Sequence, residues 1–83
     1  MQRTRIKICG VRDVTTALTA VRSGTDAIGL VFVDGSARQV TVEQSRPIIA
    51  ALPAFVEPIA LFVNASADYI RHIADTLGVR TVQ

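Results

Sequence analysis

The chain has 83 residues, which is enough for one small domain and too few for two. With 49% hydrophobic and 19% charged residues it has the composition of a folded globular protein, and disorder is excluded. No apolar run approaches the roughly 20 residues needed to cross a bilayer, so we expect no membrane partner. The net charge of +2 comes from scattered basic residues with only three Phe and one Tyr, which is atypical of nucleic-acid binders.

A single cysteine, Cys9, excludes an internal disulfide and a multi-cysteine zinc site. The sequence contains no metal-ligand spacing, no P-loop and no G-x-G-x-x-G, so we expect neither a metal nor a cofactor. The basic start is followed by a short β-branched segment and not by the apolar region of a signal peptide. These features predict a cytoplasmic protein.

The first half of the chain alternates strand and helix patterns. Residues 5–9 are short, β-branched and alternating, and Gly10 ends them. A helix is predicted over 13–23, with apolar residues at helical spacing and Gly24 at its carboxyl end. Residues 26–33 form a nearly continuous apolar run, which predicts a strand buried on both faces, as in parallel sheets.

A capping box marks the second helix. The pattern Thr41-x-x-Gln44 predicts a helix that runs to about Leu52. Pro47 falls beyond the first turn of this helix, where it removes a hydrogen bond. We therefore expect a local kink or a later helix start.

The pattern continues to the end of the chain. Pro58 leads into an apolar strand over 59–63, and Ser66 is the expected N-cap of a third helix that Gly78 ends. Residues 79–83 begin a fourth strand. The predicted fold is α/β with a parallel βαβαβαβ order, and the pattern alone allows an open doubly wound sheet or part of a closed (β/α)₈ barrel.

Candidate functional residues follow the strands, because parallel sheets bind ligands at the carboxyl ends of their strands. Cys9 ends the first strand and can act as a general base or nucleophile, with Lys7 two residues deeper on the same face; the alternative is a small buried hydrophobe. Arg38 can bind a carboxylate or phosphate, or be a solvated loop residue. Asn64 can contact a ligand or cap the turn into the third helix, whereas His72 is expected on the surface.

Four segments resemble, in order and spacing, the phosphoribosylanthranilate isomerase family, and the resemblance covers essentially the whole chain. They are Lys7–Gly10 (KICG), Asp26–Phe32 (DAIGLVF), Ser36–Val40 (SARQV) and Leu61–Asn64 (LFVN). Ala37 departs from the Pro that the family usually has before the arginine. The closing Thr81-Val82-Gln83 is similar to the family's fourth strand.

The resemblance implies a (β/α)₈ TIM barrel, of which residues 1–83 would be one incomplete domain with three βα units and the fourth strand. It implies a cofactor-free Amadori rearrangement of N-(5'-phosphoribosyl)anthranilate, a small phosphorylated substrate, in tryptophan biosynthesis. It assigns the general base to Cys9 and the anthranilate carboxylate to Arg38, with Lys7 and Asn64 as further substrate-binding candidates. The family's general acid and phosphate loops lie on later strands, so we expect these residues alone to be inactive.

Two other interpretations are weighed against this one. A free-standing half-barrel that binds or assembles without catalysis would expose an unpaired sheet edge. Such a chain is expected to self-associate or to need the carboxyl-terminal half of the barrel. A relative of indole-glycerol-phosphate synthase is disfavoured by the KICG segment.

Overall fold

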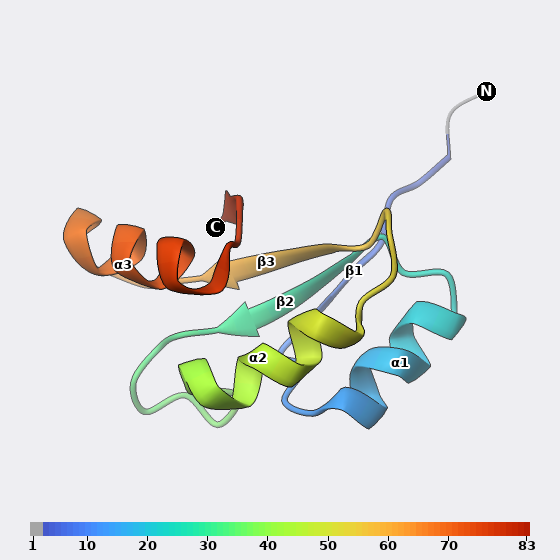
Figure 1. Ribbon diagram of the computed structural model, residues 1–83, viewed down its shortest axis with the longest axis horizontal. Helices are drawn as coiled ribbons and strands as arrows, with labels where there is room; N and C mark the ends of the chain where they lie inside the picture. The colour runs from blue at the N-terminus through green and yellow to red at the C-terminus, as the bar shows by residue number, and fades with distance from the viewer. Residues whose placement is uncertain (1–2) are drawn as a thin grey trace.

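The computed structural model describes residues 3–83; Met1 and Gln2, which the predicted domain includes, lie outside the described residues. Its four strands form one parallel sheet in the order β1-β2-β3-β4, joined by three helices (Figure 1). The elements are β1 (Lys7–Cys9), α1 (Val14–Arg22), β2 (Ala27–Val31), α2 (Val42–Ala51), β3 (Glu57–Leu61), α3 (Ala67–Leu77) and β4 (Thr81–Val82). The predicted parallel βαβαβαβ order is confirmed.

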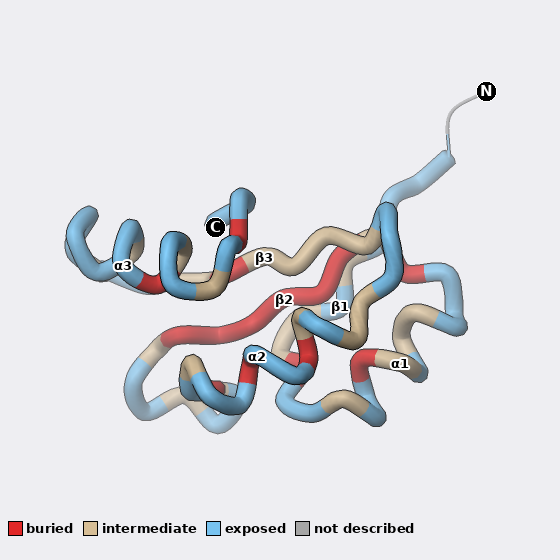
Figure 2. Tube along the Cα trace, in the orientation of Figure 1, coloured by how far each residue is buried: buried red, intermediate tan, exposed pale blue. Residues whose placement is uncertain are grey.

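One face of the sheet carries all three helices. The core joins Ile28 and Leu30 of β2 to Ala17 of α1, Ile48 of α2 and Ile73 of α3. Figure 2 shows that β2 is buried along its whole length, because it lies between β1 and β3 and under the helices. Since side chains alternate along a strand, the residues between these core positions point to the opposite face, which no helix of residues 3–83 covers.

Local capping explains where the helices begin and end. The side chains of Asp13, Thr41 and Ser66 each accept a hydrogen bond from a backbone N–H in the first turn of α1, α2 and α3. Gln44 completes the predicted capping box. Gly78 ends α3 in the left-handed conformation (φ 69°), as predicted.

The expectation for Pro47 is corrected in part. Helix α2 begins at Val42 and runs through Pro47 to Ala51 as one α-helix, so the later start is wrong. The capping box supplies the helix start, and Pro47 lies on the exposed side.

The third strand lies two residues earlier than predicted, at Glu57–Leu61 and not 59–63. Pro58 is tolerated inside it because successive N–H groups point to opposite neighbouring strands. Glu57 donates its N–H to Asp26, before β2, so the nitrogen of Pro58 faces β4. The pairing with β4 begins only at Ile59, and no ladder hydrogen bond is lost.

Among residues 3–83 no helix is long and apolar enough to cross a membrane, the longest being α3 with 11 residues.

Candidate functional site

A cavity of about 340 Å³ lies at the carboxyl ends of the strands. It brings the thiol of Cys9 and the side chain of Arg38 together, although they come from β1 and from the loop after β2. The remaining lining residues are uncharged; they are Val31, Val33, Ser36, Leu61, Phe62, Val63 and Gln83. The site therefore offers one thiol, one guanidinium, a hydroxyl, an amide and apolar walls, which suits an anionic ligand with an apolar part.

Cys9 reaches the cavity because of the residue beside it. It ends β1 on the face without helices, is half-buried, and is paired in the sheet with Gly29 of β2. Gly29 has no side chain; a Cβ built there would lie 3.2 Å from the Cys9 sulfur. The sulfur thus lies above a bare stretch of backbone and stays open to the cavity, where a proton acceptor can meet a ligand.

Arg38 is placed by a tight loop. Its backbone N–H donates to the hydroxyl of Ser36 (3.1 Å), and Gln39 donates its N–H to the Ser36 carbonyl (3.1 Å). Gln39 also forms a parallel bridge with Val31. The loop therefore returns to the sheet, and the Arg38 side chain extends over Gly10, directly after Cys9.

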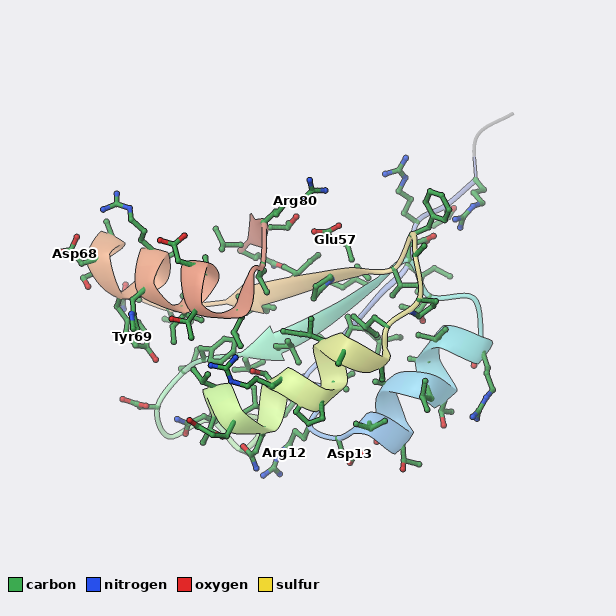
Figure 3. The ribbon with its side chains drawn as sticks, in the orientation of Figure 1. Arg12, Asp13, Glu57, Asp68, Tyr69 and Arg80 are labelled. Atoms are coloured by element: carbon green, nitrogen blue, oxygen red, sulfur yellow. The ribbon has the colours of Figure 1, made fainter. Side chains whose placement is uncertain are left out.

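Lys7 shares a face with Cys9 but does not line the same cavity. It lines a separate cavity of about 330 Å³ towards the amino ends of the strands, together with Asp26 and Glu57. Its ammonium donates a hydrogen bond to the side chain of Gln83, which lines the cavity of Cys9. Glu57, labelled in Figure 3, accepts a hydrogen bond from the Thr81 hydroxyl (3.1 Å).

Asn64 lies in a neighbouring cavity of about 280 Å³ that contains Asp34 and Tyr69, the latter labelled in Figure 3. This cavity and that of Cys9 share two lining residues, Val33 and Val63. Asn64 adopts a left-handed backbone (φ 52°), which asparagine tolerates well. The N-cap of α3 is Ser66, as predicted, and Asn64 lies in the turn that leads into this helix.

Sequence reasoning missed two residues at the site. Gly29 interrupts an otherwise apolar strand, and a glycine in a strand often marks a close approach, which is a signal that could have identified it. Gln83 follows β4 and gave no signal. His72 is exposed on α3, as predicted. No group of three or more His, Cys, Asp or Glu side chains within 3–83 is arranged to hold a metal ion.

Comparison with protein families gives a direct match. The sequence model of the family described as N-(5'-phosphoribosyl)anthranilate (PRA) isomerase matches residues 6–83. A relative of that name from Pseudomonas fluorescens is 49% identical over 83 residues, which are all of this chain and 41% of the relative. One from Neisseria meningitidis is 46% identical over 83 residues, or 40% of its length. The chain thus spans about 40% of the length of these relatives.

Solved structures match over almost the whole chain. Phosphoribosyl anthranilate isomerase from Thermotoga maritima superimposes with a TM-score of 0.93 at 38% identity, covering 98% of this chain and 40% of that one. A structure of the isomerase in complex with reduced 1-(o-carboxyphenylamino)-1-deoxyribulose 5-phosphate gives the same score and identity, covering 98% of this chain and 42% of that one. The four parallel strands and their helices match the amino-terminal part of the TIM barrel of these proteins. The chain belongs to the N-(5'-phosphoribosyl)anthranilate isomerase family.

Proposed function

We propose that the protein containing these residues is an isomerase of tryptophan biosynthesis, an intramolecular oxidoreductase of the aldose–ketose type. It converts N-(5'-phosphoribosyl)anthranilate to 1-(o-carboxyphenylamino)-1-deoxyribulose 5-phosphate by an Amadori rearrangement. The observation that carries the proposal is the shared cavity of Cys9 and Arg38 in a chain of this family. A cytoplasmic location goes with it, because the substrate is a charged phosphate ester.

The reaction needs an acid and a base. The acid protonates the ribose ring oxygen, the C1'–O bond breaks, and the anthranilate nitrogen shares the positive charge as an iminium. The base then removes the proton from C2', the electron pair forms the enolamine, and tautomerisation gives the ketone. Cys9 is suited to supply the base of the second step, since its side chain is open to the cavity and lies at the end of β1.

Arg38 is suited to hold the anthranilate carboxylate. A guanidinium offers paired N–H donors to a carboxylate, and Arg38 is the one charged residue among those lining the cavity. Val31 and Leu61 also line the cavity and offer an apolar surface against which the aromatic ring can pack.

Lys7 and Asn64 have secondary parts in this proposal. Lys7 acts indirectly: its ammonium holds the side chain of Gln83 by a hydrogen bond, and Gln83 lines the cavity of Cys9. Asn64 acts from the neighbouring cavity, whose walls at Val33 and Val63 also belong to the cavity of Cys9.

The acid and the phosphate-binding loops are supplied by later strands, so residues 1–83 form one incomplete domain and are inactive alone. Loss of a general acid costs about 10²- to 10⁴-fold in rate. A barrel completed by joining Gln83 to the carboxyl-terminal segment of the Pseudomonas fluorescens relative, here called the completed barrel, tests the function.

The assay follows the loss of substrate fluorescence, with circular dichroism to verify folding. We expect turnover by the completed barrel and a fall in kcat of about 10²- to 10⁴-fold for Cys9→Ala. His72→Ala, on the exposed side of α3, is the control and keeps its activity. A completed barrel that folds but shows no turnover contradicts the proposed isomerase function. Full activity of Cys9→Ala contradicts only the role of Cys9 as the base.

A second candidate, a half-barrel that assembles through its open edges, rests on exposed apolar side chains. Ile6 and Ile8 at the β1 edge are 46% and 40% exposed, and Val82 at the β4 edge is 47% exposed. Both edges lack a neighbouring strand within residues 3–83. We expect the 83-residue chain to self-associate in size-exclusion chromatography, unless the carboxyl-terminal segment is added. A monomer over a hundredfold range of concentration argues against this candidate.

A further inference from the structure

Gly10, which follows Cys9, lies under the side chain of Arg38. A Cβ built on Gly10 would lie 3.2 Å from Arg38 Cγ and 3.3 Å from Nε, and it would overlap Cδ outright. The aliphatic part of Arg38 therefore occupies the space that any side chain at residue 10 would fill. Gly10 is fixed in turn, because its N–H donates to the carbonyl of Gly29 (3.0 Å), as does that of Val11 (3.2 Å).

Two separate demands make residue 10 a glycine. Its φ of +82° is a conformation that side chains disfavour, and its surface is covered by Arg38. The other glycines with positive φ, at 24, 35 and 78, share the first demand but have nothing within 4 Å of a built Cβ. Gly10 is thus the one positive-φ glycine in residues 3–83 at which a neighbouring side chain occupies the space that a Cβ would take.

We propose that Gly10 is a positioning residue, which seats Arg38 at a fixed place relative to Cys9. This inference rests on the proposed function, since it concerns the two groups assigned to the substrate. Because residues 9 and 10 are adjacent, the proposed base, Cys9, and the glycine on which Arg38 packs belong to one turn of the backbone. The spacing between the base and Arg38 is therefore set by the backbone and not by the flexible arginine alone.

An alanine at residue 10 is expected to displace Arg38 without unfolding the protein. The overlapping atoms belong to the stem of an exposed, flexible side chain, which can move away. The remaining cost is the backbone strain at positive φ. Gly24→Ala carries the same strain at φ +93° with no contact, so it is the matched control.

The kinetic test uses the completed barrel with Gly10→Ala, Arg38→Ala, the double variant and Gly24→Ala. We expect Gly10→Ala to raise KM about 10- to 100-fold, the value of a charge-assisted hydrogen bond. The double variant is expected to match Arg38→Ala alone, because the glycine acts only through the arginine. Gly24→Ala should lose similar thermal stability and keep the wild-type KM. A KM for Gly10→Ala equal to that of Gly24→Ala overturns the proposal.

A second readout does not need turnover. The rates at which iodoacetate and iodoacetamide alkylate Cys9 are compared by mass spectrometry of its peptide at low salt. A guanidinium beside the thiol favours reaction with iodoacetate, which is the anionic reagent. Arg38→Ala and Gly10→Ala should therefore both lower the ratio of the iodoacetate rate to the iodoacetamide rate about 2- to 5-fold. If Gly10→Ala or Arg38→Ala leaves the ratio unchanged, the positioning role is wrong. If the variants lower this ratio in a completed barrel that shows no turnover, the positioning role of Gly10 is supported and the proposed isomerase function is contradicted.

Discussion

The sulfur of Cys9 and the backbone of Gly29 are packed so closely that a Cβ on residue 29 would push the sulfur aside by a few tenths of an ångström. The two residues are paired across β1 and β2, and a Cβ on residue 29 would lie 3.2 Å from the sulfur and 3.1 Å from the Cα of Cys9. The same Cβ would lie 3.1 Å from Cδ1 of Leu61. The leucine can rotate, but the strand that carries the thiol cannot yield without disturbing the sheet.

Gly29→Ala is therefore expected to move the thiol. We predict a fall in kcat of the completed barrel of about 10-fold, since misplacing a reacting group by a fraction of an ångström is costly. Overpacking should also lower the free energy of unfolding by about 1 to 3 kcal/mol. Steady-state kinetics and urea unfolding measure the two effects.

The matched control adds Leu61→Val to Gly29→Ala. This second change relieves the contact with the leucine and leaves the contact with the thiol. Stability should recover in part while kcat stays low. If kcat of Gly29→Ala equals that of the wild type, the glycine has no part in placing the base.

Asp26 makes the stability of the fold depend on pH in the acid range. The pKa of its carboxyl lies below the ordinary 3.8, first because Arg3 donates hydrogen bonds to it and then because the Ile6 N–H does (2.8 Å). A lowered pKa in the folded state means that the carboxylate stabilises the fold fully above the unfolded value, and less as pH falls through both values. Asp26→Asn should thus cost stability at pH 7, and the cost should shrink below about pH 4.

Urea unfolding of the completed barrel at pH 7, 5, 4 and 3 measures this change. Asp75→Asn, on an exposed part of α3, serves as the control for removing a charge. A difference between wild type and Asp26→Asn that is the same at pH 3 as at pH 7 contradicts the prediction.

Features set by neighbouring residues in sequence were predictable. The capping residues Thr41 and Ser66 act on backbone N–H groups within the next turn, so the sequence alone locates the starts of α2 and α3. The place of Cys9 and Arg38 at the carboxyl end of the sheet follows from parallel topology, which the alternation of strands and helices indicates.

Features set by distant segments were not predictable. Pro58 is tolerated inside β3 because β4 pairs with β3 only from Ile59 onward. The residues near Pro58 in sequence do not determine the register of β4. Strand alternation placed Lys7 and Cys9 on one face, but the hydrogen bond between Lys7 and Gln83 joins residues 76 apart. Such a contact depends on the curvature of the whole sheet, so the separate cavity of Lys7 was missed.

Pro47→Ala is expected to stabilise α2. Proline in a helix interior removes a hydrogen bond and crowds the carbonyl four residues earlier, that of Glu43. Pro47 is exposed, so its replacement loses little packing. We predict a gain of about 1 to 2 kcal/mol, less than the full helix cost because the unfolded chain also gains freedom. Thermal unfolding measures it, with Ala50→Gly as the opposite control. A Tm unchanged by Pro47→Ala means that the helix already relieves the proline.

Phe55 combines full exposure with an unfavourable backbone. It lies in the turn between α2 and β3 with φ 71°, and Val56 donates its N–H to the carbonyl of Pro53 (3.4 Å). This is the third position of a four-residue turn, where a positive φ favours glycine. A phenylalanine there incurs the left-handed strain of about 1 kcal/mol and gains no burial in return.

Phe55→Gly should therefore stabilise the protein slightly, by up to about 0.5 kcal/mol once the greater freedom of glycine in the unfolded chain is subtracted. Phe55→Val, which is branched at Cβ, should destabilise it at the same φ. Ala54→Gly in the preceding position, which needs no positive φ, is the control and should lower the Tm. Urea unfolding of the three variants ranks them, and a Phe55→Gly variant less stable than the wild type would show that the phenylalanine packs against something in solution.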